Sequence, residues 1–119
     1  DSAMTAASTV RMSSLPAAFL APEVVVEWAP FHLADGVSEA ELIAASDRLH
    51  DDVLRNHPGF VHRELVRLEG GQWADLVFWR NQEAVQAIMA QAPRDPVFGA
   101  YFRCMKDGSM ALAQRVRLY

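Results

Sequence analysis

The spacing of apolar and polar residues predicts a regular fold from residue 23 onward. Residues 23–33 are rich in β-branched and aromatic side chains and predict a first strand. Residues 38–56 carry apolar side chains three and four apart, which predicts a helix. Two further strand-like runs, 60–68 and 73–80, flank Gly70 and Gly71 and predict a hairpin.

The remaining third of the chain repeats the helix-then-strand order. Asn81 is the expected N-cap of a second helix that runs to Pro93, and a restart with Asp95 as N-cap and Pro96 as first helical residue follows. Asp107 and Gly108 indicate a turn before a last strand. For the first helix, Ser38 and Glu41 have the spacing of a capping box.

The resulting order β-α-β-β-α-β predicts an α+β, ferredoxin-like fold, in which two helices cover one face of a four-stranded antiparallel sheet. Both faces of the expected sheet carry apolar side chains. One face of the hairpin has Phe60, Val66, Leu68, Trp73, Val77 and Trp79, and the other has Val61, Leu65, Ala74, Leu76 and Phe78. Because one helical layer covers only one of these faces, we expect a homodimer that pairs sheet against sheet.

Composition narrows the classes of protein that fit. The chain has 119 residues, enough for one domain, and a formal charge of −4, which disfavours nucleic acid and anionic membranes as partners. A single cysteine and the absence of a membrane-length apolar run predict a cytoplasmic protein. Residues 1–22, rich in Ala and Ser, are expected to be a loosely ordered arm that includes a candidate cloning remnant, and residues 23–119 form the domain.

Several stretches resemble a known family. "PGFVHREL", "DLVFWRNQEAVQAIM" and "DPVFGAYF" look like the antibiotic biosynthesis monooxygenase-like group of the dimeric α+β barrel superfamily, and the likeness covers residues 23–119. The resemblance implies an eight-stranded barrel made by two sheets, with a cavity between the sheet and the helices of each protomer. It also implies one of several activities, which include cofactor-free oxygenation of polycyclic phenols and quinones, haem degradation and lactone isomerisation.

The absence of certain residues and motifs from the sequence reduces the number of activities to consider. Haem-degrading members carry an Asn in the first strand and a His on the second helix, and this chain has neither. It also lacks glycine-rich nucleotide loops, CxxC, HExxH and GxSxG, so the usual nucleotide, zinc and serine-hydrolase sites are not expected. Asp47 and His50 are spaced for a metal, but a solvated acidic helix face explains them better, and Cys104 fits a buried apolar position.

The hairpin carries the expected catalytic residues. A two-residue turn at Gly70-Gly71 would place His62 opposite Trp79, Glu64 opposite Val77 and Val66 opposite Asp75. His62, Glu64, Asp75 and Trp79 would then share one face. In this hypothesis His62 is a general base, and Asp75 or Glu64 orients it. In the alternative, the two carboxylates pair with arginines and His62 is structural.

Aromatic residues supply the expected walls of a pocket. Trp79 and Trp28 are candidates to hold a flat ligand. Phe98, Tyr101 and Phe102 are candidates to roof the same cavity, although a Phe/Tyr stripe at this spacing is more often core.

The functional hypothesis is a small monooxygenase-like enzyme that acts on an aromatic or polycyclic molecule without metal or flavin. The alternative is a non-catalytic dimeric module that binds a small apolar ligand or stabilises an assembly; a lactone isomerase ranks third. A continuous cavity that reaches His62 would favour the enzyme. A filled core, with Glu64 and Asp75 bonded to Arg63, Arg67 or Arg115, would favour the module.

Overall fold

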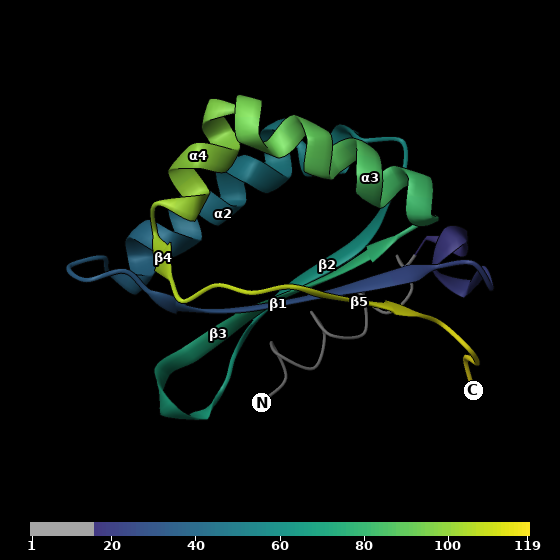
Figure 1. Cartoon of the computed structure of the whole chain (residues 1–119), viewed down its shortest axis with the longest axis horizontal. Coiled ribbons are helices and arrows are strands. Elements are labelled where there is room, and N and C mark those ends of the chain that lie inside the picture. The colour runs from purple at the N-terminus through teal and green to yellow at the C-terminus, as the bar shows by residue number, and fades with distance from the viewer. Residues whose placement is uncertain (1–15) are drawn as a thin grey trace, which may run out of the picture.

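The computed structural model describes residues 16–119 and shows helices packed over one face of an antiparallel sheet (Figure 1). The strands are β1 (Val25–Leu33), β2 (Phe60–Arg67), β3 (Gln72–Trp79), β4 (Met105–Lys106) and β5 (Ala111–Gln114). The α-helices are α2 (Glu39–Asp52), α3 (Gln82–Gln91) and α4 (Pro96–Phe102). Short 3-10 turns are η1 (Ala17–Leu20), η2 (Leu54–Asn56), η3 (Glu69–Gly71) and η4 (Ala92–Arg94).

The sheet has the strand order β2-β3-β1-β4, and β5 pairs with a different part of β1. The predicted ferredoxin-like βαββαβ order is therefore confirmed, with its last strand in two pieces. Within residues 16–119 no helix is long and apolar enough to cross a membrane.

Local capping fixes where the helices begin. Ser38 Oγ accepts a hydrogen bond from the Glu41 amide at 3.1 Å, and Glu41 Oε1 accepts one from the Ser38 amide at 3.0 Å. This reciprocal pair satisfies two amides that the helix leaves free, and it confirms the predicted capping box. The expected caps Asn81 and Asp95 are also confirmed, each accepting from a backbone amide at 2.9 Å.

The break in the fourth strand lies opposite Pro30. β4 pairs with residues 32–33 of β1 and β5 with residues 25–28, so residues 29–31 have no ladder partner on that edge. The Pro30 carbonyl accepts a bond from the Ser109 amide at 3.1 Å, which shows that this edge of Pro30 faces the segment between β4 and β5. Proline has no N–H to return, so a continuous ladder cannot form there.

The expected register of the hairpin is wrong by one residue. The turn contains three residues, Glu69–Gly71, with Gly70 and Gly71 at φ +77° and +81°. As a result Leu65 pairs with Asp75 and His62 pairs with Phe78, and an irregularity between Phe60 and His62 follows. A one-residue shift sends side chains to the opposite face, because strand side chains alternate.

The faces of the sheet follow from this register. Val25, Phe31, Trp73, Val77 and Trp79 join the core formed with helix residues such as Leu42, Leu49, Val85 and Ile88. The outer face stays partly uncovered: Trp28 is 37% exposed, and its ladder partners are also accessible, with Leu76 on β3 only partly buried and Ala111 on β5 exposed. Phe19 of η1 covers another part of this face, where its ring packs on His62 and Phe78.

Only residues 16–22 of the predicted arm are described here, and residues 1–15 lie outside the described part. In that described piece, the Arg115 guanidinium donates to the backbone carbonyls of Phe19 and Ala21 and lies over the Phe19 ring. Residues 19–21 are therefore held against the body of the protein.

Gly59, at the start of β2, packs too closely on α3 to accept a side chain. A Cβ at Gly59 would lie 2.2 Å from the Ala84 Cβ. We expect Gly59→Ala to lower the free energy of unfolding by about 1–3 kcal/mol in a urea titration, because the overlap forces β2 and α3 apart. Adding Ala84→Gly should recover part of the loss.

Gly99 is the matched control for this substitution. Among the described residues, a Cβ at Gly99 in α4 would meet only Arg103 Nη1, at 3.5 Å. Gly99→Ala should stabilise the protein by up to about 1 kcal/mol, as alanine does in a helix interior. An unchanged midpoint for Gly59→Ala would show that the strand and helix are not in the close contact described.

Candidate functional site

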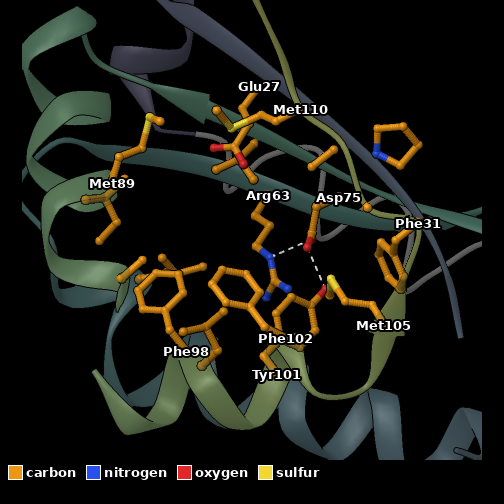
Figure 2. Close-up of a pocket in the computed structure, with 18 of the residues that line it drawn as sticks. Glu27, Phe31, Arg63, Asp75, Met89, Phe98, Tyr101, Phe102, Met105 and Met110 are labelled. Carbon is orange, nitrogen blue, oxygen red and sulfur yellow. Dashed lines mark hydrogen bonds and ion pairs between the residues drawn. The ribbon is translucent and has the colours of Figure 1, made fainter. Parts of the chain in front are cut away.

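A cavity of about 490 Å³ lies between the sheet and the helices (Figure 2). Its volume is within the range of roughly 300–1,000 Å³ found for small-molecule sites. Most of its walls are apolar. The lining side chains of the sheet and of the segment after α4 include Ala29, Phe31, Val77, Trp79, Met105 and Met110, and those of the helices and the turns next to them include Leu49, Leu54, Ile88, Met89, Phe98, Tyr101 and Phe102.

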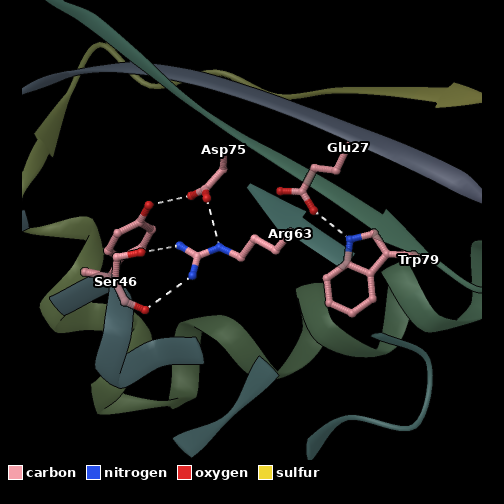
Figure 3. Close-up of polar contacts among 6 residues, drawn as sticks. Glu27, Ser46, Arg63, Asp75 and Trp79 are labelled. Atoms are coloured by element: carbon pink, nitrogen blue, oxygen red, sulfur yellow. Dashed lines mark hydrogen bonds and ion pairs between the residues drawn. The ribbon is translucent and has the colours of Figure 1, made fainter. Parts of the chain in front are cut away.

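One wall of the cavity carries a buried ion pair between Arg63 and Asp75 (Figure 3). Arg63 Nε donates to Asp75 Oδ1 at 2.9 Å, and the two side chains are only 6% and 10% exposed. Tyr101 Oη donates to the other carboxylate oxygen at 2.5 Å. The guanidinium also donates to Ser46, to Oγ at 2.7 Å and to the carbonyl at 3.3 Å.

This network joins three elements around one charge pair. Arg63 comes from β2, Asp75 from β3 and Tyr101 from α4, and Ser46 adds a fourth anchor from α2. Burial, the largest single effect, would lower the pKa of Arg63, but the charge interactions and hydrogen bonds with Asp75 and Tyr101 together outweigh it and the pKa is raised. Burial, together with the negative charge of Asp75, raises the pKa of Tyr101, so its hydroxyl stays a donor. The network therefore holds the Arg63–Asp75 pair in a fixed position through hydrogen bonds from Tyr101 and to Ser46.

Glu27 is the second polar feature of the cavity wall. It pairs with Val77 in the β1–β3 ladder, and Ala29 pairs with Asp75, so Glu27 and Asp75 are diagonal neighbours on the helix-facing side. Trp79 Nε1 donates to Glu27 Oε1 at 2.9 Å (Figure 3). No other side chain among residues 16–119 donates a hydrogen bond to this carboxylate.

The setting of Glu27 favours its protonated form. Burial raises the pKa of Glu27 above its ordinary value of 4.5, and the Trp79 hydrogen bond offsets only part of this effect. The nearby negative charge of Asp75 raises the pKa further, while Arg63 lowers it. Asp75 forms an ion pair with Arg63, whereas no side chain among residues 16–119 forms an ion pair with Glu27, so the two carboxylates lie in different electrostatic settings.

The expected site residues divide between the two faces of the sheet. Five of the eight line the cavity, namely Asp75, Trp79, Phe98, Tyr101 and Phe102. The prediction that His62, Glu64, Asp75 and Trp79 share one face is wrong, because the corrected register turns His62 and Glu64 outward. His62 Nε2 lies 3.0 Å from Glu64 Oε2, beside Phe19 and Phe78.

Trp28 also lies away from the cavity. It pairs with Leu76 in the β1–β3 ladder, on the face opposite to Glu27 and Ala29. His62, Glu64 and Trp28 therefore cannot contact a ligand in this cavity, and the function proposed below does not use them. The roles of the five lining residues remain predictions.

Sequence reasoning did not include Glu27 or Arg63 among the site residues. Glu27 is a lone carboxylate within "VVVEWAPF", on the strand face that also carries Phe31. A single charged residue in such an apolar strand indicates a buried polar site, so the sequence contains a signal from which Glu27 could be predicted. Arg63 had no comparable signal, because its face depends on the length of the hairpin turn.

Two other side chains have ordinary structural settings. Cys104 is buried and its thiol donates to the Ala100 carbonyl at 3.5 Å, and burial raises the pKa of the thiol. His50 packs on the Phe60 ring, and burial lowers its pKa. No set of three or more His, Cys, Asp or Glu side chains among residues 16–119 is arranged to hold a metal ion.

Compared by sequence, the chain matches no protein-family model and no curated protein. Compared by structure, it is similar to SnoaB, a cofactor-independent oxygenase from Streptomyces nogalater, with a TM-score of 0.67 and 19% identity over 81% of this chain and 96% of SnoaB.

Two proposed antibiotic biosynthesis monooxygenases are also similar. The protein from Caulobacter crescentus has a TM-score of 0.67 and 16% identity over 81% of this chain and 92% of its own. The protein from Bordetella bronchiseptica has a TM-score of 0.66 and 16% identity over 80% and 99%. The chain therefore has the antibiotic biosynthesis monooxygenase-like fold that the sequence predicts.

Proposed function

We propose that this protein is a cofactor-independent, monooxygenase-like enzyme that acts on an aromatic or polycyclic small molecule. The observation that carries the proposal is the carboxylate of Glu27 in the wall of a largely apolar cavity, with a raised pKa and one donor, Trp79. A base is most effective when its pKa lies near the working pH, and burial moves Glu27 in that direction.

In the proposed reaction, Glu27 takes the proton of a phenol or an enol bound in the cavity. The resulting anion is electron-rich and reacts with O₂ at carbon to form a peroxide, which takes up the proton from Glu27. Loss of water from the hydroperoxide leaves a carbonyl. For anthrone as a model substrate, the balance is one anthrone and one O₂ to one anthraquinone and one water. The apolar walls keep bulk water from competing with O₂ and the ring.

Arg63 supplies the positive charge that the anion needs. Its guanidinium uses three N–H groups on Asp75 and Ser46, out of the five that arginine has. Because Asp75, Ser46 and Tyr101 fix the guanidinium before the ligand arrives, its charge stabilises the developing oxyanion without reorganisation. Trp79 and Phe98 would hold the ring by stacking and edge contacts.

The fold likeness agrees with this proposal, since SnoaB is a cofactor-independent oxygenase. At 19% identity, the likeness supports the fold and assigns no residue role. The arguments for Glu27 and Arg63 therefore rest on the geometry of this chain alone.

We also propose that the protein is a homodimer through the outer face of its sheet. Trp28 and its ladder partners Leu76 and Ala111 form an apolar surface there that no described helix covers. A second copy would bury this surface. Sedimentation of the purified protein measures whether it is a monomer or a dimer.

Oxygen uptake tests the enzymatic proposal. We expect the purified protein, in a buffer that contains a chelator and no flavin, to accelerate O₂ consumption by anthrone, with one anthraquinone formed per O₂. An oxygen electrode and the absorbance of the quinone measure the two quantities. A rate equal to that of buffer, with a correctly folded protein that binds anthrone, would contradict the proposal.

A non-catalytic binding module is the second candidate, and one observation favours it. Asp75 is fully engaged by Arg63 and Tyr101, as expected of a structural ion pair. The open cavity, on the other hand, does not fit a filled core. Binding of anthrone without oxygen uptake would favour the module.

A further inference from the structure

The cavity has an apolar mouth formed by Met89, Phe102 and Met110, here called the mouth residues. All three line the cavity and are nevertheless 48%, 48% and 41% exposed. They come from different parts of the chain: Met89 from α3, Phe102 from α4, and Met110 from the segment between β4 and β5. Figure 2 shows them on different sides of the Arg63–Asp75 pair.

At this site the charged side chains are buried and most of the exposed side chains are apolar, which is the reverse of the usual distribution in a folded protein. The ion pair is deep, with side chains 6% and 10% exposed, whereas the exposed side chains that line the cavity are apolar apart from Ser109. A ligand that only filled the interior would leave three large apolar side chains in water. Surface apolar groups gathered at a cavity commonly mark a contact that the free protein does not show.

We propose that the mouth residues bind an apolar substituent of the ligand, which extends outward from a ring held beside Glu27. This inference rests on the proposed function for the position of the ring. Met89 and Met110 have unbranched thioether side chains that adapt to flexible groups. Phe102 lies 5.6 Å from Phe98, measured between ring centroids, so the apolar wall continues from the interior to the mouth.

The charges of the cavity favour an alkyl or alkenyl group at this position. The charged side chains that line the cavity, among the described residues, are Glu27, Arg63 and Asp75, and none belongs to the mouth. A carboxylate or phosphate on the substituent would find no cation there. The ligand class is therefore an oxygenated aromatic ring with an uncharged hydrophobic tail.

Anaerobic binding of anthrone and of its 2-propyl and 2-hexyl derivatives tests the inference, with tryptophan fluorescence as the signal. Exclusion of O₂ keeps the ligands unchanged. We expect affinity to rise with chain length, by up to about fourfold for each methylene that becomes buried. The quantity of interest is the ratio of the anthrone Kd to the hexyl-anthrone Kd.

Glutamine variants locate the effect. Met89→Gln and Met110→Gln should each lower this ratio by at least about threefold, because a polar amide replaces an apolar contact. Ile43→Gln is the matched control, since Ile43 is an apolar side chain on α2 with 44% exposure and does not line the cavity. Its ratio should equal that of the wild type.

The remaining outcomes overturn the inference in distinguishable ways. Equal affinity for the three ligands would overturn it and leave the proposed function in place. Failure to bind anthrone would overturn both. A change in sedimentation of the Met89 or Met110 variant, with an unchanged ratio, would overturn the inference and assign the mouth to contact with a second copy of the chain.

Discussion

Replacing Arg63 with methionine should lower the free energy of unfolding by about 3–5 kcal/mol. The substitution leaves Asp75 buried, with Tyr101 as its remaining donor, and removes two bonds to Ser46. An unpaired buried carboxylate is costly because it has lost its hydration without gaining a cation. Urea unfolding followed by fluorescence measures the loss.

Two further variants separate the buried charge from the loss of a side chain. Arg63→Met combined with Asp75→Asn should be more stable than Arg63→Met alone, because neither ion remains. Arg67→Met, four residues along β2, breaks an exposed ion pair with Glu39 and should cost less than about 1 kcal/mol. Equal losses for the Arg63 and Arg67 variants would contradict the account of the network.

Glu27→Gln should lower turnover of anthrone by about 10²–10⁴-fold, the usual effect of removing a general base. The glutamine keeps an oxygen that can accept the Trp79 bond, so the cavity should still bind the ring. The Kd for anthrone measured without O₂ should therefore stay close to that of the wild type. Glu64→Gln, on the outer face of β2, is the control and should leave turnover unchanged.

The pH dependence gives an independent test of Glu27. The base must be ionised, so turnover should rise with pH and level off above the folded-state pKa of Glu27, which lies above 4.5. The contribution of Glu27 to the free energy of unfolding should change in the opposite direction and fall as pH rises. Below about pH 4.5 Glu27 is protonated in both states, and as pH rises the unfolded chain ionises first and is favoured.

Glu27→Gln removes this penalty. The variant should be more stable than the wild type at neutral pH, and the difference should shrink as pH falls toward 4.5. Loss of turnover without this gain would indicate that Glu27 is not held in an unfavourable charged state, and it would count against its role as the base.

Much of the fold could be predicted because the signals were local. Ser38 with Glu41, Asn81, and Asp95 with Pro96 start their helices in the structure as the sequence indicates. Such caps depend on contacts within three residues, so no knowledge of distant partners is needed. The division of the last strand was not predicted, because it depends on which edge of β1 the Pro30 ring faces.

The candidate site was harder to predict because it depends on register. Two glycines suggested a two-residue turn, but Glu69 joins them in the loop. This single residue exchanges the faces of β2, turning Arg63 inward and His62 outward. On β3 the shared face of Asp75 and Trp79 survives, because alternation within one strand does not depend on its partner. A prediction that catalytic residues on two different strands share a face is therefore less reliable than one for residues on a single strand.

Because Pro30 has no N–H, the segment opposite it is free to vary in sequence and length. The segment 107–110 contributes Gly108, Ser109 and Met110 to the cavity wall and is joined to β1 by the bond from Ser109 to Pro30. Residues inserted or randomised there would disturb few ladder bonds and none of the core strands. Directed evolution toward new ligands should therefore begin with libraries in this segment, where selectivity can vary at little cost to folding.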